Sequence, residues 1–142
     1  MRRNLLAFLA GLATLASVHS AIACSCHAID PVFAYSKFGV VLLAKVSGLE
    51  TTPIEGPWTV TLVVLKSWKG PWQSNATIQV QTDGPHGACG FFIHTGDEFI
   101  VYSQDPVTFT VIGLCDTVRG DDVPIIVQKL DALSRSAPKS NP

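Results

Sequence analysis

The stretch WTVTLVVLKSWKG, residues 58–70, gives the clearest indication of the fold. From Trp58 to Leu65, apolar residues alternate with a mixed set of threonine and aliphatic residues. This period of two is typical of a strand that is buried on one face and partly buried on the other. Lys69-Gly70-Pro71 follows, and glycine and proline at this point favour a turn. Residues 58–65 are therefore predicted to form a strand of a sheet.

Four further segments have the character of strands. Val40 to Val46 is an apolar, β-branched run, and in Ala76 to Gln81 the apolar residues alternate cleanly with polar ones. Phe99 to Tyr102 and Thr108 to Leu114 are predicted to be the fourth and fifth strands in chain order. Five short strands in one small domain indicate a mainly β fold, for which a five-stranded OB-like barrel is the economical candidate.

Two helices are expected beside these strands. Asp30-Pro31 has the acidic cap and first-position proline of a helix start, and the helix should run to about Phe38. We expect it to bury Phe33, Ala34 and Phe38. Asp121-Asp122 is expected to cap a C-terminal helix, with Pro124 in its first turn. Four apolar residues at helical spacing should form the inward face of that helix: Ile125, Ile126, Leu130 and Leu133.

The N-terminal segment has the pattern of a cleaved secretory signal. Two arginines precede the apolar run Leu5–Val18, and Ala21-Ile22-Ala23 has the small-x-small form of a cleavage site. We therefore expect a signal peptide at 1–23, one secreted or periplasmic domain at 24–133 and a disordered polar tail at 134–142. Two alternatives remain, an uncleaved N-terminal anchor and a lipoprotein acylated on Cys24. Lipidation is disfavoured because Ala21 stands where such signals usually have leucine.

Charge argues against a nucleic-acid partner. The signal peptide holds two of the ten basic residues, so the mature chain has a formal charge of about −3 and no basic run. The tryptophans at 58, 68 and 72 could stack on bases, as in OB folds that bind oligonucleotides. In an acidic chain, packing in the core or against turns is the better interpretation.

Four cysteines, Cys24, Cys26, Cys89 and Cys115, remain in the mature chain. In an oxidising compartment an even number of cysteines favours two disulfides. Sequence alone allows three connectivities, and a bond between Cys24 and Cys26 would close a strained ring. The two N-terminal cysteines should therefore each have a distant partner, so that two bonds fasten a part of the chain that normally frays.

Several motifs in this order resemble the tissue inhibitors of metalloproteinases and the wider netrin-like domains. The mature chain opens with Cys24-Ser25-Cys26, and the strand quoted above ends in residues 65–70, LKSWKG. Ala88-Cys89-Gly90-Phe91-Phe92 precedes GDEFIVY at residues 96–102, and Cys115 follows. The resemblance covers nearly the whole mature chain. It implies an OB-like barrel with flanking helices and the disulfides Cys24–Cys89 and Cys26–Cys115.

The resemblance also implies a function. In the family, the free N-terminal amine and carbonyl, here those of Cys24, chelate the catalytic zinc of a target endopeptidase, and the next residue, here Ser25, enters its specificity pocket. Further contacts with the protease are expected from His27, Ala28, Gly87 and Ala88. The chain lacks the family's third N-terminal-domain disulfide and its cysteine-rich second subdomain, so it is more similar to the compact bacterial members.

Other functions have weaker support in the sequence. Many netrin-like domains carry these cysteines only as structural crosslinks, so an extracytoplasmic interaction module is the main alternative. His27, His86 and His94 are scattered, so we expect no metal site and no cofactor of the protein's own. No feature suggests the lowered thiol pKa of a Cys-x-Cys redox centre. No Ser-His-Asp or paired-carboxylate motif is present, so we do not expect an enzyme.

Overall fold

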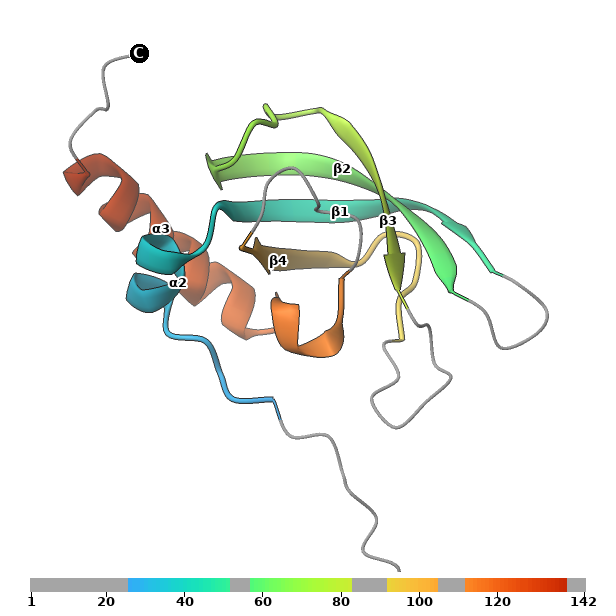
Figure 1. The fold of residues 1–142 in the computed structure, drawn as a ribbon, viewed down its shortest axis with the longest axis horizontal. Helices are drawn as coiled ribbons and strands as arrows, with labels where there is room; N and C mark the ends of the chain where they lie inside the picture. Colours follow the sequence, from blue (N-terminus) through green and yellow to red (C-terminus); the bar gives the residue numbers. More distant parts are fainter. Residues whose placement is uncertain (1–25, 52–56, 83–91, 105–111, 138–142) are drawn as a thin grey trace, which may run out of the picture.

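The computed structural model describes residues 26–51, 57–82, 92–104 and 112–137. Five strands form one antiparallel sheet in the order β3-β2-β1-β4-β5, with a helix near each end of the described chain (Figure 1). The elements in chain order are α2 Pro31–Lys37, β1 Val40–Glu50, β2 Trp58–Lys69, β3 Thr77–Thr82, β4 Glu98–Ser103, the 3-10 turn η2 Leu114–Asp116, β5 Thr117–Arg119 and α3 Asp122–Ser136. The predicted mainly β class is confirmed.

The two longest strands, β1 and β2, bend along their length. Their pairing is interrupted by register shifts at three places, the last of them between Val46 and Gly48. Such bulges increase the local twist of a strand pair, so a long pair curls. In Figure 1, β3 accordingly crosses in front of β1 at a steep angle. The sheet thus has a concave face.

Each face of the sheet carries a separate core. The concave face gathers alternate residues of β1 to β4, including Val60, Leu62 and Val64 from β2, with Ile93 and Ile112 from the connections. On the opposite face, α2 and α3 pack on Val41, Ile100 and Tyr102. As the alternation in residues 58–65 predicts, one set of alternate residues is buried: Val60, Leu62 and Val64 lie in the concave core, while Trp58 at the start of the set is half-buried.

Helix α2 begins as predicted but buries a different set of residues. The Asp30 carboxylate accepts a hydrogen bond of 2.9 Å from the Phe33 backbone N–H and so caps the helix. Ala34 is fully buried, and Phe38 packs on Tyr102 with ring centroids 5.6 Å apart. The expected burial of Phe33 is wrong, because Ala34 and its i+4 neighbour Phe38 form the inward face. Phe33 lies about 100° away from Ala34 around the helix and is 55% exposed.

Helix α3 likewise buries only some of the apolar residues that were expected to face inward. Leu130 is fully buried, and Ile126 and Leu133 pack around it at i−4 and i+3. Ile125 is exposed, so its predicted burial is wrong. Asp121 is the N-cap residue, but its side chain accepts no capping hydrogen bond.

The C-terminal helix is also longer than expected. It continues through Ser136, beyond the domain end expected at residue 133. The Ser134 and Ser136 hydroxyls donate to the carbonyls of Asp131 and Leu133, at 3.1 and 2.9 Å. These residues of the expected tail therefore belong to α3, and residues 138–142 lie outside the described residues.

The fifth strand requires a correction. The sequence predicts it at 108–114, of which 108–111 lie outside the described residues and 112–114 are not strand. The chain instead forms the turn η2 and then the three-residue strand β5, which pairs with β4. The turn forms because the Asp116 backbone N–H donates to the Gly113 carbonyl and the Asp116 carboxylate accepts from the Gly113 N–H, both at 3.2 Å.

The end of β2 is fastened to α3 by a polar cluster. The Trp68 indole N–H and the Lys66 ammonium both donate to Oδ1 of Asp131 in α3, at 2.7 and 2.6 Å. These bonds, first that of Lys66 and then that of Trp68, lower the pKa of Asp131. Trp68 packs on the helical side and Trp72 against the concave core. At these two positions the packing interpretation of the tryptophans holds.

Candidate functional site

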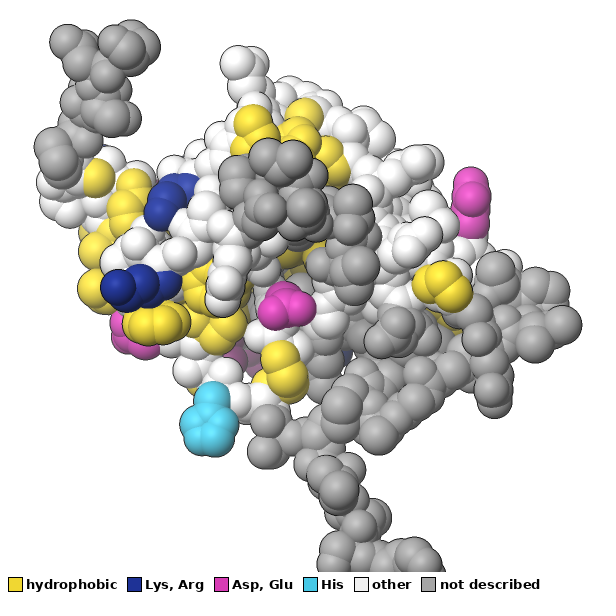
Figure 2. Space-filling model, viewed as in Figure 1, with side chains coloured by type: hydrophobic (Ala, Val, Ile, Leu, Met, Phe, Trp, Pro, Cys, Tyr) yellow, Lys and Arg dark blue, Asp and Glu magenta, His cyan; other side chains and the backbone are white. Residues whose placement is uncertain are grey.

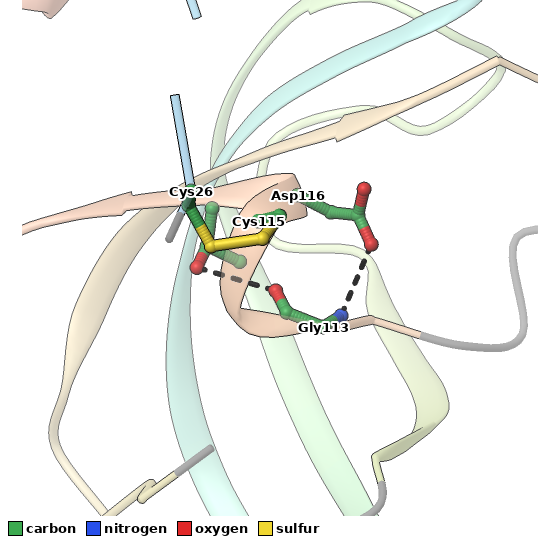
Figure 3. Close-up of a disulfide and its surroundings, with 5 residues drawn as sticks. Cys26, Gly113, Cys115 and Asp116 are labelled. Carbon is green, nitrogen blue, oxygen red and sulfur yellow. Dashed lines mark hydrogen bonds between the residues drawn. A yellow bond between two sulfur atoms is a disulfide. The ribbon is translucent and has the colours of Figure 1, made fainter. Parts of the chain in front are cut away.

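The Cys26–Cys115 disulfide is present, as the family resemblance implied (Figure 3). It joins the first described residue to η2 across 89 residues of sequence, with the two Cα atoms 5.1 Å apart. Both cysteines lie at the surface. The start of the described chain is therefore covalently fixed beside β5. Cys24 and Cys89, the other predicted pair, lie outside the described residues.

The turn that carries Cys115 is itself braced. Around it, Gly113 and Asp116 are joined by two reciprocal hydrogen bonds, of which Figure 3 draws the one from the Gly113 N–H to the Asp116 carboxylate. The Thr117 hydroxyl donates to the Gly113 carbonyl at 3.5 Å. Thr117 then enters the sheet opposite Val101. Cys26 is therefore fixed to a closed turn at the start of a strand and not to a free loop.

Residues 26–29 form an exposed ridge held at both ends. Cys26, His27 and Ala28 are exposed, whereas Ile29 packs against the core beneath α2 and α3. Within the described ranges, no hydrogen bond joins 27–29 to the rest of the chain. The disulfide at one end and the Asp30 cap of α2 at the other therefore determine where the ridge lies.

A cleft of about 350 Å³ runs beside the ridge. Its walls come from the ridge, from η2 and β5, and from the first turns of α3. It is lined by Cys26, His27, Ala28, Ile29, Cys115, Thr117, Val118, Arg119, Asp122 and Ile126. Two of the predicted contact residues, His27 and Ala28, thus flank a concave surface, the usual setting for a binding site.

Arg119 connects this cleft to a distant part of the chain. Its guanidinium Nη1 donates a 2.6 Å hydrogen bond to the backbone carbonyl of Phe92. Phe92 is the first described residue after 83–91, the range that contains Gly87, Ala88 and Cys89. The point where the chain leaves that range is therefore fixed to β5, the strand that follows Cys115.

The structure thus brings together only part of the predicted site. Four of its residues meet at the cleft: Cys26, Cys115, His27 and Ala28. The other predicted contact residues lie outside the described residues: Cys24, Ser25, Gly87 and Ala88. Sequence reasoning missed Arg119 and Phe92. Phe92 belongs to the quoted Cys-Gly-aromatic motif, but nothing in the sequence pairs it with an arginine 27 residues later.

The described ranges contain neither a cluster of metal-ligating side chains nor a membrane-spanning helix. There, no three histidine, cysteine, aspartate or glutamate side chains lie close enough to hold a metal ion together. His27 and His94 are both exposed and belong to different regions. In the same ranges, neither helix has the length and apolar character needed to span a bilayer.

Comparison with family models and with curated proteins found no match to this chain. The resemblance to netrin-like domains therefore rests on the sequence motifs and their spacing.

Proposed function

We propose that this chain is an exported, non-enzymatic netrin-like protein that inhibits a zinc endopeptidase. The observation that carries the proposal is the Cys26–Cys115 disulfide. Removal of the signal peptide after Ala23 would make Cys24 the N-terminal residue. The disulfide fixes the chain at Cys26, only two residues further on.

The OB-like barrel belongs to the same proposal. A sheet of order β3-β2-β1-β4-β5 becomes a closed barrel if the segment around β5 meets β3. One backbone hydrogen bond supports this: the Ile112 N–H donates to the carbonyl of Gln81 in β3 at 2.9 Å. Ile112 is also buried in the concave core with residues of β1 to β4. That core would then be the barrel interior.

The mechanism requires a free α-amine on Cys24. A catalytic zinc keeps one position open for water or substrate, and the Cys24 amine and carbonyl oxygen would occupy it as a chelate. An α-amine has a pKa near 8, so a useful fraction is neutral at physiological pH. Ordering a loose terminus would oppose binding, and a nearby crosslink lowers that entropic cost.

The remaining contacts follow from the position of the ridge. Ser25, between the two cysteines, would enter the specificity pocket of the protease. His27 and Ala28 continue the ridge beside the cleft, and Gly87 and Ala88 would flank Ser25 if Cys89 is joined to Cys24. The zinc belongs to the target, so the protein itself needs no cofactor.

The test compares the mature protein with a form carrying one extra alanine before Cys24, on a panel of zinc endopeptidases. The extension moves the amine away from its chelating position, so inhibition should be lost while the fold is unchanged. A form with one alanine added after Pro142 is the matched control and should inhibit normally. Inhibition should also weaken as pH falls below the amine pKa, because the protonated amine cannot coordinate zinc. Equal inhibition by the two N-terminal forms would refute chelation.

A second candidate function has one specific observation in its favour. Helix α2 exposes Val32 and Phe33, at 58% and 55%, and Val32 lines a groove between α2 and α3. Figure 2 shows hydrophobic side chains gathered at that helical end of the molecule. An interaction module would use such a surface and have no protease to block. Absence of inhibition by either N-terminal form across the panel would favour this function.

A further inference from the structure

Phe92 is the most exposed of the large hydrophobic side chains that lie at the surface of the described residues. Its exposed fraction is 62%, while the next residue, Ile93, is 2% exposed and belongs to the concave core. Neighbouring residues in an extended segment point to opposite sides. The burial of Ile93 therefore turns the Phe92 ring outward.

The backbone is held at Phe92 and at the residues that follow it. Arg119 donates a short, charge-assisted hydrogen bond of 2.6 Å to its carbonyl. Beyond Ile93, the His94 N–H donates to the Asp97 carboxylate at 2.8 Å, and the Gly96 N–H donates to the Val46 carbonyl at 2.9 Å. The aromatic ring thus projects from backbone that is hydrogen-bonded at Phe92 itself and again at His94 and Gly96.

Arg119 also places Phe92 relative to the ridge. The arginine lines the cleft together with Cys26 and His27, and it bonds directly to Phe92. The surface therefore runs from the ridge across the cleft to an exposed aromatic side chain. If the active site of a partner covers the ridge, then the partner surface next to that active site would contact the Phe92 ring.

We infer that Phe92 is a second partner-contacting residue, which inserts its ring into an apolar depression beside the catalytic cleft of the target endopeptidase. This inference rests on the proposed function and adds a contact that does not involve the zinc. Aromatic side chains on a fixed backbone are common hot spots of interfaces, because they bury a large area and lose little conformational freedom.

The test measures inhibition constants of the mature native protein, Phe92→Ala and Phe33→Ala on the same protease panel. Phe33 is the matched control, because it is also an exposed phenylalanine but lies on α2. Phe92→Ala should weaken inhibition by about tenfold or more, the size expected of a hot spot. Phe33→Ala should leave it within about twofold, the range of an energetically neutral contact. Thermal unfolding of both variants should match the native protein.

Further measurements separate the possible outcomes. The pH dependence of inhibition by Phe92→Ala should keep the native shape, because the amine still binds the zinc. Arg119→Met should weaken inhibition in the same direction, since it releases the Phe92 carbonyl. Inhibition by Phe92→Ala equal to that of the native protein would overturn this inference and leave the proposed function intact. A native protein that inhibits no member of the panel would overturn both.

Discussion

Removal of the Cys26–Cys115 crosslink by the double substitution to alanine should destabilise the protein by several kcal/mol. The bond joins residues separated by 89 positions, and for a loop of this length the chain-entropy relation gives about 4.6 kcal/mol at 25 °C. Both cysteines are exposed residues, so little buried apolar area is lost with them. The expected effect therefore arises in the unfolded chain, which gains freedom when the loop is opened.

Urea denaturation of the two proteins, followed by tryptophan fluorescence and circular dichroism, measures this effect. Neither Cys26 nor Cys115 belongs to a strand pair of the described sheet, so we expect the variant to keep the native circular dichroism spectrum. Its free energy of unfolding should fall by about 3 to 5 kcal/mol. His27→Ala is the control, because the side chain is adjacent and exposed, and it should change stability by less than about 0.5 kcal/mol. A loss below about 1 kcal/mol for the double variant would refute the loop-closure reasoning.

Two other substitutions test polar groups outside the ridge. Asp131→Asn should cost about 1 kcal/mol at neutral pH, since it weakens the bonds from Lys66 and Trp68 at a partly exposed site. The pKa of Asp131 is lower in the folded than in the unfolded protein, so the ionised carboxylate stabilises the fold at pH values above its unfolded pKa. This stabilisation is lost as the pH falls through the folded pKa. In acid unfolding curves, the difference in stability between the native protein and Asp131→Asn should therefore shrink below about pH 4. Burial, and then the charge of Asp30, raises the pKa of Tyr102 to about 12, so native stability should fall as pH rises above about 10. Alkaline denaturation of Tyr102→Phe should not show this fall in stability. At pH 7 the substitution should leave stability unchanged or raise it by up to about 1 kcal/mol, because the buried Tyr102 hydroxyl has no hydrogen-bond partner in the described structure.

The strands were predictable where burial follows a period of two. In β3, Ile78 and Val80 are buried while Thr77, Gln79 and Gln81 are exposed, and this alternation is visible in the sequence. Strand β5 could not be found in this way, because Thr117–Arg119 is too short to show a period. It exists because η2 delivers the chain beside β4, which depends on contacts between distant residues.

Helix faces were predicted less well than helix positions. The starts of α2 and α3 follow from acidic and proline residues, which act locally. Phe33 and Ile125 are as apolar as their buried neighbours, so sequence alone cannot choose which face turns inward. The sheet surface around Val41 and Tyr102 makes that choice. The bond between Arg119 and Phe92 escaped prediction for the same reason, since it depends on where strand β5 meets the connection that precedes β4.

The size of the disulfide effect also carries information about Cys24 and Cys89, which the described residues do not include. If these two are joined, the shortest covalent path from Cys26 to Cys115 in the unfolded chain passes through their bond. That path spans about 28 residues, for which the entropy relation gives about 3.6 kcal/mol.

Loss of Cys26–Cys115 should then destabilise a chain that also lacks Cys24 and Cys89 by about 1 kcal/mol more than it destabilises the native chain. Urea denaturation of the four proteins in this cycle gives that difference directly. Additive effects would mean that Cys24 and Cys89 are not joined, as expected if Cys24 is lipidated. Because the coupling arises from loop length in the unfolded chain, it reports the second crosslink without requiring any native contact between the two.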